Sequence, residues 1–496
     1  MLTIEEIKTF INEDNASDLK KGARLGQRYY EGRHDILDYR IFYYNDDGNL
    51  VEDKYRSNAK ISHPFFTILV DQLESYIMSF EESPIRAKEG VQGLQEQLDL
   101  YFNNKFWAVI GELITGASCK GFEYLYAYKN KKDRTAFQCA DSLGVIEVRA
   151  NDTDDKCEYV IFWYADRIEK GNKKIKRIQV WDAKQKYYFV QDGDGEIKED
   201  NEEPINPKPH TLYQEGNGQI TYEEFGYIPF FRLDNNKQRK SSLFAVKDII
   251  DDYDIHACSL SNNLIDFDTP LHVVKGFEGD KLDELQKNVK TKKIIGVAED
   301  GGVDVKTVDI PYQARLAKLE LDEKNIFVFG MGFNPSQIGD GNITNVVIQS
   351  RYALLDMKAA KMITQLCALL DDVVGVVLAE INANEGTGYK ITDIEYKFSK
   401  ETITNTTENI ANDKIKAETK QIEVNTVLDV AEQIGGEKAL KAICDIMEWD
   451  FEELKPQLDT MENQQNGLNA AQNALDSVIT EETQPTAAES GEVINE

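Results

Sequence analysis

The stretch Val246-Lys-Asp-Ile-Ile-Asp-Asp-Tyr-Asp254 opens the segment that decides the architecture of this chain. Apolar residues recur there at intervals of three and four, at Val246, Ile249, Tyr253, Ala257, Leu260, Leu264 and Phe267. This spacing predicts one long helix with a single apolar stripe, ending near Asp268-Thr-Pro270. The acids at positions 251, 252 and 254 lie off that stripe.

A second helix is predicted from Gln313 to about Phe329, and a small unit separates it from the first. The sequence of this unit predicts a strand at Leu271–Val274, a helix at Asp280–Val289, and strands at Lys293–Val297 and Val303–Val308 around a Gly301-Gly302 turn. Two helices with a small αβ module inserted between them describe a stalk that carries a knob.

The second stalk helix is interrupted by Gly330-Met-Gly332, and an unusually neutral stretch follows. From Asn325 through Ser350 the only charged residue is Asp340, in a chain with 29% charged residues. A further helix is then predicted from about Thr344 to Ile381. At 1.5 Å per residue its length would be roughly 57 Å, so we expect it to connect several layers of the molecule.

The N-terminal half changes character near residue 120. Before that point we predict helices from Thr3 to about Gly32, from Pro64 onward, and from about Gln92 through Thr115. From Phe122 to about Asp234 the apolar period becomes two, which predicts an antiparallel meander. Within the meander, Asp192-Gly-Asp-Gly-Glu resembles the opening of a calcium loop. Ile197 stands where that loop needs glycine, so we predict a hairpin turn.

The C-terminal part is predicted to contain a strand at Tyr389–Phe398 and helices around Ala411–Ile434 and Lys438–Ile446. From about Thr480 the chain is acidic and poor in apolar residues, which is typical of a disordered tail. The combination of helical and antiparallel β regions places the chain in the α+β class.

The 57 Lys and Arg residues against 88 Asp and Glu residues give a formal charge of −31. A surface of this kind repels nucleic-acid phosphates and anionic membranes, which argues against tight DNA binding. The N-terminus lacks the pattern of a signal peptide, and the apolar run Val373–Ala379 is shorter than the roughly 20 residues that span a bilayer. We therefore expect a soluble protein made in the cytosol, with its six scattered cysteines acting as small buried apolar residues.

The sequence contains no recognisable catalytic motif, phosphate loop or metal-binding pattern. We expect no enzymatic activity, no cofactor and no metal, and we expect the five histidines to lie at the surface or to cap helices. An acidic metal-dependent nuclease remains as an alternative, in which Asp251, Asp252 and Asp254 would join Asp266 or Asp268 around magnesium. Because the first three do not share one helical face, a solvated acidic surface is the favoured interpretation.

Motifs in a fixed order over roughly residues 20 to 400 resemble the portal proteins of tailed double-stranded DNA bacteriophages, in particular the siphovirus portal family of Gram-positive hosts. The motifs are Arg28-Tyr-Tyr-Glu-Gly-Arg-His-Asp-Ile36, Asn58-Ala-Lys-Ile-Ser-His-Pro64, Val70-Asp-Gln-Leu-Glu-Ser-Tyr76 with Ser83-Pro-Ile85, Ile228-Pro-Phe-Phe-Arg-Leu-Asp-Asn-Asn236, and Val246 to Asp254 with Ser259 and Asn262-Asn263. Each motif alone is weak, and their order makes the combination specific.

The resemblance implies the portal fold, and the segments predicted above fit its plan. The implied parts are a wing (1–240), a first stem helix (241–268), a clip (269–310), a second stem helix (311–330), a tunnel loop (331–343), a long helix with a wing strand (344–400), a helical crown (401–479) and a disordered acidic tail (480–496).

The resemblance also implies a function without catalysis. Portal subunits form a ring, expected to be dodecameric, at one capsid vertex of the virion, and the ring is assembled in the cytoplasm of the bacterial host. Double-stranded DNA passes through it without sequence specificity during packaging and ejection. The implied partners are the terminase large subunit, the major capsid protein, the scaffold and the head-tail connector protein. Another capsid or scaffold protein is the remaining structural alternative.

Three groups of residues are predicted to carry this function. The DNA-facing tunnel loop comprises Phe333, Asn334, Ser336, Gln337, Asp340 and Asn342; the channel-lining stem comprises Asp251, Asp252, Asp254, Arg315 and Lys318; and the clip residues that dock terminase or connector are Asp283, Glu284, Lys287 and Lys290. A pore in which DNA must slide should offer few ion pairs, since each bound phosphate adds affinity and drag. Arg315 and Lys318 either contact DNA or pair with Glu320 or Asp322.

Overall fold

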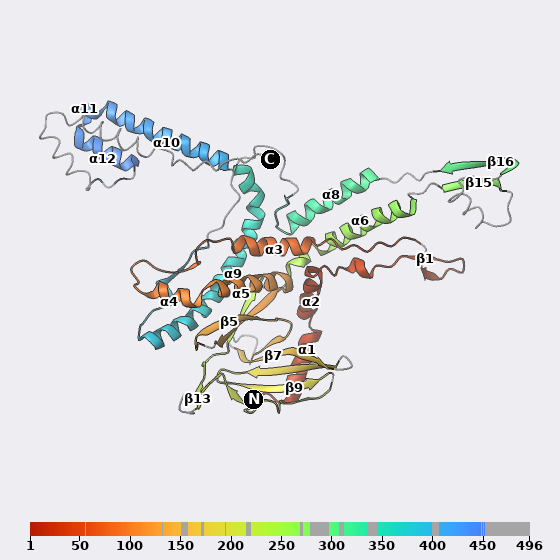
Figure 1. The fold of residues 1–496 in the computed structure, drawn as a ribbon, viewed down its shortest axis with the longest axis horizontal. Helices are drawn as coiled ribbons and strands as arrows, with labels where there is room; N and C mark the ends of the chain where they lie inside the picture. Colours follow the sequence, from red (N-terminus) through yellow and green to blue (C-terminus); the bar gives the residue numbers. More distant parts are fainter. Residues whose placement is uncertain are drawn as a thin grey trace, which may run out of the picture. The chain divides into compact units, whose positions relative to one another are not determined.

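The computed structural model describes residues 1–54, 56–130, 132–149, 157–169, 173–193, 195–214, 220–267, 271–277, 297–306, 312–335, 345–398, 406–447, 449 and 451. The chain divides into two units, one of Met1–Asp340 with Gln349–Thr402 and the other of Gly341–Ile348 with Ile403–Glu496. Figure 1 shows the helices and strands of both units, which confirm the predicted α+β class.

The first predicted helix is two helices, α1 (Ile4–Ala16) and α2 (Asp18–Tyr30). Ser17 adopts an extended conformation between them, and its side chain accepts a hydrogen bond from the Lys20 amide. This serine therefore caps α2 and interrupts a helix that the apolar spacing had predicted to be continuous. The 3₁₀ helix η1 (Asp35–Asp38) follows.

The predicted helix after Pro64 is confirmed as α3 (Phe65–Ile77). The next predicted helix is divided into α4 (Leu94–Tyr101) and α5 (Asn104–Lys120), and it ends five residues later than the predicted Thr115. Asn103 caps the start of α5. Gly121 ends the helix in a left-handed conformation (φ +98°), where a Cβ would collide with the backbone oxygen of Arg239.

The region from Phe122 to Asp234 is antiparallel, as predicted. The largest sheet has the order β10-β9-β8-β7-β6 with β11 also pairing with β9, and a second sheet has the order β14-β4-β5. The bounds are β4 (Phe122–Lys129), β5 (Thr135–Ala140), β6 (Val145–Arg149), β7 (Cys157–Glu169), β8 (Lys173–Trp181), β9 (Gln185–Asp192), β10 (Ile197–Glu199), β11 (Lys208–Pro209) and β14 (Phe230–Asp234). Ile197 pairs with Gln191, which confirms the hairpin after Asp192.

Four shorter strands stand apart from these sheets in two-stranded pairs. β1 (Phe42–Tyr44) pairs with β2 (Leu50–Glu52), and β12 (Thr211–Gln214) pairs with β13 (Ile220–Glu223). The first pair forms a hairpin between η1 and α3. The second joins the large sheet to β14.

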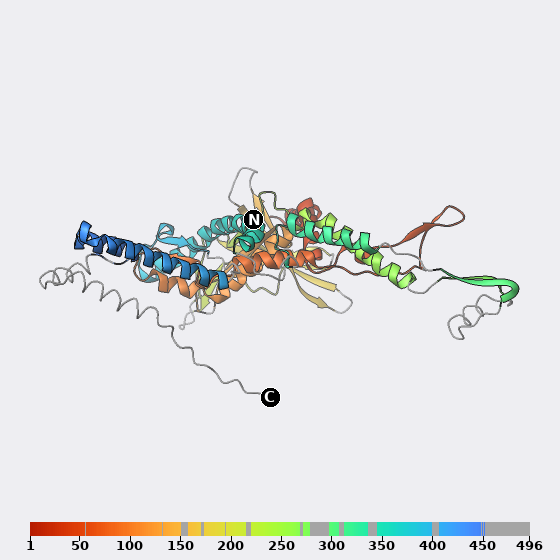
Figure 2. The same cartoon turned by 90° about the horizontal axis from the view of Figure 1, so that it is seen from above.

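The predicted stalk consists of the 3₁₀ turn η2 (Ser242–Ala245), α6 (Lys247–Phe267) and α8 (Tyr312–Phe329). Figures 1 and 2 both show α6 and α8 side by side. Beyond them, β15 (Leu271–Phe277) pairs antiparallel with β16 (Val297–Lys306). The predicted Gly301-Gly302 turn is wrong, because Gly302 pairs with Lys275 inside a single long strand. The predicted helix Asp280–Val289 lies outside the described residues.

Helix α9 (Asn345–Glu385) is the long helix that the sequence predicts. Leu366, Leu370, Val373 and Val377 are fully buried in the largest core cluster, together with residues of α3, α4 and α5. By length and composition the part Ser350–Glu385 would also suit a membrane span. Its burial in this cluster identifies it instead as the central core helix of the first unit.

The chain then forms η5 (Ile391–Asp393) and β17 (Ile394–Tyr396), which pairs with β3 (Ile85–Ala87). The predicted strand Tyr389–Phe398 is therefore shortened. In the second unit, α10 (Thr406–Asp429), α11 (Ala431–Ile434) and α12 (Gly436–Met447) confirm the predicted helical character. The predicted acidic tail lies outside the described residues.

Candidate functional site

The two stem helices are joined by a seam of ion pairs and hydrogen bonds. The Lys318 amine lies 2.5 Å from the Asp322 carboxylate and also pairs with Asp252 on α6. Partial burial opposes the charge of this amine, but the hydrogen bonds that it donates to Asp252 and Asp322 raise the pKa of Lys318. Asp322 is buried, so Lys318 is its neutralising partner. This arrangement agrees with the ion-pair interpretation of Lys318 rather than with a free DNA contact.

Arg315 lies one turn before Lys318 and contacts neutral groups. Its guanidinium donates to the Ser259 hydroxyl at 3.2 Å, and the Asn263 side-chain oxygen accepts from the same guanidinium at 2.6 and 2.8 Å. The predicted alternative, an ion pair with Glu320 or Asp322, is therefore not formed by Arg315. Its hydrogen bonds to α6 set the relative position of the two helices.

Two of the three acids predicted to line the channel serve as anchors for the N-terminal region. Asp251 accepts a hydrogen bond from the Tyr29 hydroxyl at 2.5 Å and lies 2.5 Å from the Lys247 amine. Asp254 is fully buried, and its two oxygens lie 2.7 Å from Nδ1 of His34 and Nδ1 of His63. The prediction that Asp254 lines a channel is wrong, since a buried carboxylate cannot face a pore. Asp252 remains partly exposed.

The buried Asp254 also corrects the prediction for the histidines. His34 is buried and stacks on Tyr29 with 4.6 Å between ring centroids, so it is not a surface residue. It occupies the N-cap position of η1, but its side chain makes no capping hydrogen bond. Burial opposes the charge of Asp254, but hydrogen bonds from His34 and His63 outweigh it and lower the pKa of the carboxyl. The aspartate therefore remains ionised as a structural anchor.

The segment Ser57–His63, which we call the strap, lies along α6 in a regular pattern. Backbone amides of residues 57, 59, 61 and 63 donate to side chains of Asp266, Asn262, Cys258 and Asp254. Two residues of extended chain advance about 6.6 Å, and four residues of helix advance about 6 Å, so the two repeats nearly match. The four-residue spacing of Asp254, Cys258, Asn262 and Asp266 on α6 is the sequence pattern from which this contact could have been predicted.

The start of the predicted tunnel loop is fixed to the core. The Gln72 side chain donates to the Phe333 carbonyl at 2.7 Å and accepts from the Phe333 amide at 3.1 Å. The Phe333 ring stacks on Tyr352 of α9 with centroids 4.5 Å apart, and Asn334 is buried and donates to Glu323. Phe333 and Asn334 therefore anchor the start of the loop. The burial of Asn334 corrects its predicted DNA-facing role, whereas the same role of Phe333, which is partly buried, stays a prediction.

The glycines before this anchor permit close packing. A Cβ on Gly330 would lie 2.5 Å from Leu69 Cδ1 and 2.7 Å from the Ile326 oxygen, and Met331 has a positive φ of 54°. Lys358 of α9 donates to the Gly330 carbonyl at 3.0 Å, and burial lowers the pKa of this amine to about 8. The end of α8 is thus held by α3 and α9.

The remaining predicted site residues lie outside the described part of the chain. They are Ser336, Gln337, Asp340 and Asn342 of the tunnel loop, and Asp283, Glu284, Lys287 and Lys290 of the clip. Among the described residues no group of three or more His, Cys, Asp or Glu side chains is arranged to hold a metal ion. Of the acids proposed for a magnesium site, Asp268 lies outside the described residues. The others have separate partners: Tyr29 and Lys247 for Asp251, Lys318 for Asp252, two histidines for Asp254, and Ser57 for Asp266.

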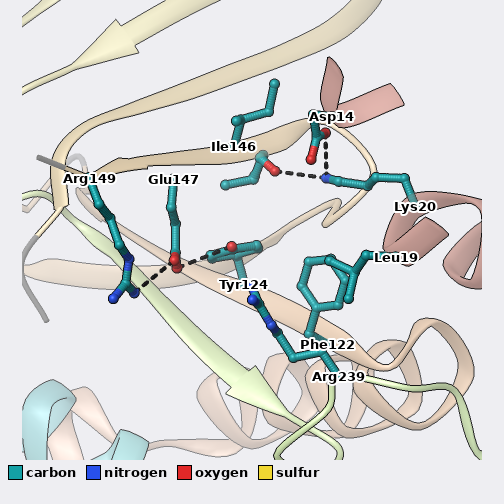
Figure 3. Close-up of a pocket in the computed structure, with 10 residues that line it drawn as sticks. Asp14, Leu19, Lys20, Phe122, Tyr124, Ile146, Glu147, Arg149 and Arg239 are labelled. Atoms are coloured by element: carbon teal, nitrogen blue, oxygen red, sulfur yellow. Dashed lines mark hydrogen bonds and ion pairs between the residues drawn. The ribbon is translucent and has the colours of Figure 1, made fainter. Parts of the chain in front are cut away.

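A cavity of about 200 Å³ lies between the N-terminal helices and the strands β4 and β6. Figure 3 shows Lys20 pointing toward Asp14, and Glu147 between Tyr124 and Arg149. The Lys20 amine lies 3.1 Å from Asp14 and donates to the Val145 carbonyl at 2.8 Å. Protein groups thus neutralise these charges, and we assign this cavity a structural role in joining α2 to the sheets.

Comparisons with known proteins point to one family. Residues 10–463 match the family model described as phage portal protein, SPP1 Gp6-like. A portal protein of Bacillus phage SPP1 is 27% identical over 71% of this chain and 68% of its own length, and a portal protein of Clostridium phage phiCD119 is 24% identical over 76% and 82%.

A solved structure, the neck of a native GTA particle computed with C12 symmetry, has a TM-score of 0.35 and 12% identity and covers 72% of this chain and 85% of its own. That structural similarity is too low to support a conclusion by itself. The match to the family model covers most of the sequence, including both stem helices. This chain therefore belongs to the SPP1 Gp6-like family of phage portal proteins.

Proposed function

We propose that copies of this chain form a ring whose central channel is lined by the stem, and that phage DNA passes through it during packaging and ejection. Membership in the portal family makes the protein a structural component of the virion at the head-tail connection. The observation that carries the proposal for the channel is the α6–α8 pair, in which Lys247, Arg315 and Lys318 are held by ion pairs or hydrogen bonds inside the subunit.

The charges on the stem suit a polymer that must slide. Helix α6 carries Asp248, Asp251, Asp252, Asp254 and Asp266 against Lys247. On α8, Arg315 and Lys318 are engaged by α6, whereas Lys324 is exposed on α8. Each cation that pairs with a phosphate adds counterion-release affinity. We propose that Lys324 is the stem cation available to DNA, and that the acids keep the duplex away from the wall.

The partners implied by the portal family extend this proposal. The clip would dock the terminase large subunit during packaging and the head-tail connector afterwards, while the wing would contact the major capsid protein and scaffold. We propose a dodecamer and no enzymatic activity of the portal itself. A plasmid-cleavage assay with Mg²⁺ or Mn²⁺ tests the last point, since cleavage by the purified chain would restore the nuclease alternative.

Electron microscopy of the purified full-length chain tests the ring. We expect top views with a continuous central hole at several protein and salt concentrations. Particles that remain monomers or dimers under all conditions would contradict the proposal. Closed shells would indicate a capsid or scaffold protein instead.

A charge reversal tests the sliding argument. A lysine in place of the buried Asn334 would disturb folding. The charge reversal is therefore placed at Glu320, which is exposed on α8. We expect Glu320→Lys to leave the ring intact but to slow DNA packaging in a phage complementation assay. Lys324→Gln should leave packaging at least as fast as in the unchanged protein. A normal packaging rate with Glu320→Lys would contradict the argument that the acidic side chains of the stem reduce drag on the DNA.

A further inference from the structure

The hairpin formed by β1 and β2, which we call the arm (residues 39–53), exposes apolar side chains on both of its faces. In this antiparallel pair Tyr44 is opposite Leu50, and Tyr43 is opposite Val51. Tyr44 is 74% exposed and Leu50 is 58% exposed. An isolated two-stranded hairpin is at best marginally stable in water. Side chains of this kind in such a hairpin indicate a surface that another chain covers.

The arm is held in a defined position by the strap. The Ser57 hydroxyl donates to Asp266 at 2.6 Å, and the Asn58 amide group donates to the Tyr39 carbonyl at 3.2 Å. The base of the arm therefore lies beside the C-terminal end of α6. A surface that is fixed before binding loses less entropy on association than a mobile one.

A second apolar surface lies at the same end of the stem. We call it the stem tip; its members are Leu264 and Ile265 of α6, and Tyr312 and Leu316 of α8. The contact of Arg315 with Ser259 and Asn263 shows that the start of α8 lies beside the last turns of α6. Ile265 is 63% exposed and Tyr312 is 55% exposed, so the chain's own arm does not cover the stem tip.

We propose that the arm docks on the stem tip of a second copy of this chain. The inference rests on the ring proposed above, because a cyclic ring uses two different surfaces of each subunit, one on either side. The arm and the stem tip are two such surfaces, both apolar and both located at the distal end of α6. One subunit thus supplies the hairpin, and the next supplies the helix ends.

The charges support a second copy as the occupant. Residues 39–60 carry Arg40, Lys54, Arg56 and Lys60 against four acids, so this segment is neutral in a chain of net charge −31. The exposed Arg40 and Arg56 each lie 3.7 Å from an acid of the same segment, Glu52 and Asp53, so the charges at the base of the arm balance locally. The stem of a neighbouring copy offers the acidic helix α6. A neutral arm approaches this acidic surface without the repulsion that most pairs of surfaces on this chain would experience.

A photo-crosslinking experiment on the full-length chain tests the contact directly. Tyr44 is replaced by p-benzoylphenylalanine, and ¹⁴N and ¹⁵N copies are mixed before assembly and irradiated. We expect crosslinks from position 44 to peptides containing residues 264–265 or 312–316 of the other isotopic copy. Rings that form with crosslinks only within one chain, to other surfaces, or with no crosslink at all would overturn the docking proposal alone. Absence of any ring would overturn the proposed function as well.

A variant pair tests the energetic contribution. Tyr44→Ser with Leu50→Ser removes one apolar face of the arm, and we expect the concentration needed for half-maximal ring assembly to rise at least tenfold. Asp46→Asn with Asp47→Asn changes the exposed turn of the same hairpin and serves as the control, with an expected change below threefold. Circular dichroism verifies that both variants fold. Equal assembly of the two folded variants would contradict the proposal.

Discussion

The carboxylate of Asp254 lies 2.7 Å from Nδ1 of His34, although 220 residues separate the two in the sequence. The second carboxylate oxygen lies at the same distance from Nδ1 of His63 and accepts the His63 amide at 2.9 Å. One buried acid of the first stem helix thus holds both the end of the N-terminal helical region and the end of the strap. This contact joins α6 to the N-terminal part of the chain.

Replacement of Asp254 by asparagine should destabilise the subunit. An amide cannot accept the two histidine hydrogen bonds in the same way, and breaking a buried charged network by changing one partner costs about 3 kcal/mol. Urea unfolding of the full-length chain measures the loss. Asp248→Asn, at an exposed position of the same helix, should change the free energy of unfolding by less than about 0.5 kcal/mol. Equal effects of the two substitutions would contradict the anchoring role.

The Asp254 carboxyl also predicts that the free energy of unfolding depends on pH in the acidic range. Its pKa is lowered in the folded state, so its contribution is fully present above the unfolded value of about 3.9 and is lost as pH falls through the lower folded value. The difference in unfolding free energy between the unchanged protein and Asp254→Asn should therefore shrink as pH is lowered from 6 to 3. A difference that stays constant over this range would show that ionised Asp254 is not the source of the stability.

Gly330→Ala should weaken the junction between α8 and the tunnel loop. The added methyl group would meet Leu69, which is buried, and the Ile326 carbonyl. Overpacking of this kind costs about 1–3 kcal/mol. Gly388→Ala is the control, because no heavy atom lies within 4 Å of the Cβ position there. Denaturant midpoints of the two variants should differ clearly, and coincident midpoints would mean that the packing at Gly330 is loose.

Lys318→Ala should destabilise the stem by leaving the buried Asp322 without its cation. The expected cost is about 1–3 kcal/mol in thermal or denaturant unfolding. The double variant Lys318→Met with Asp322→Leu removes both charges and should recover most of the loss, because an apolar pair avoids the desolvation of an unpaired acid. If Lys318→Ala leaves the free energy of unfolding unchanged, Lys318 becomes a candidate for DNA contact again.

The buried amine of Lys358 leads us to expect that the free energy of unfolding depends on pH in the alkaline range. Burial lowers its pKa to about 8, whereas an unfolded lysine has a value of about 10.4. The unfolded chain therefore binds more protons between these values, and stability should rise as pH increases from about 7 to 9.5. This rise should be smaller in Lys358→Met and unchanged in Lys361→Met, which alters an exposed lysine of the same helix. Free energies of unfolding of the unchanged protein and the two variants, measured at about pH 7 and 9.5, test this prediction.

Much of the secondary structure was predictable from apolar periodicity. The spacing in α6, α8 and α9 predicts three long helices, and the alternation after Phe122 predicts the meander, because each pattern depends only on neighbouring residues. The break at Ser17 was not predictable in this way. Its flanking helices carry compatible apolar spacing, and the serine cap interrupts them.

The candidate site was predictable only in outline. The sequence indicated a polar stem and a neutral loop, but it assigned Asp254, Phe333 and Asn334 to exposed surfaces. Asp254 is bound by His34 and Phe333 by Gln72, each more than 200 residues away in the chain, and Asn334 donates to Glu323 of α8, 11 residues earlier. Periodicity reports which face of one element is apolar, and it contains no information about such distant partners.

The sequence by itself determined most of the elements, their order and the family, since these follow from local patterns and from motifs in a fixed succession. Only the tertiary structure decided which charges remain available at the surface. The four-residue repeat at Asp254, Cys258, Asn262 and Asp266 is visible in the sequence, but its partner is the strap, about 200 residues earlier. Burial and pairing are properties of the packed chain, and they convert predicted channel acids into structural anchors.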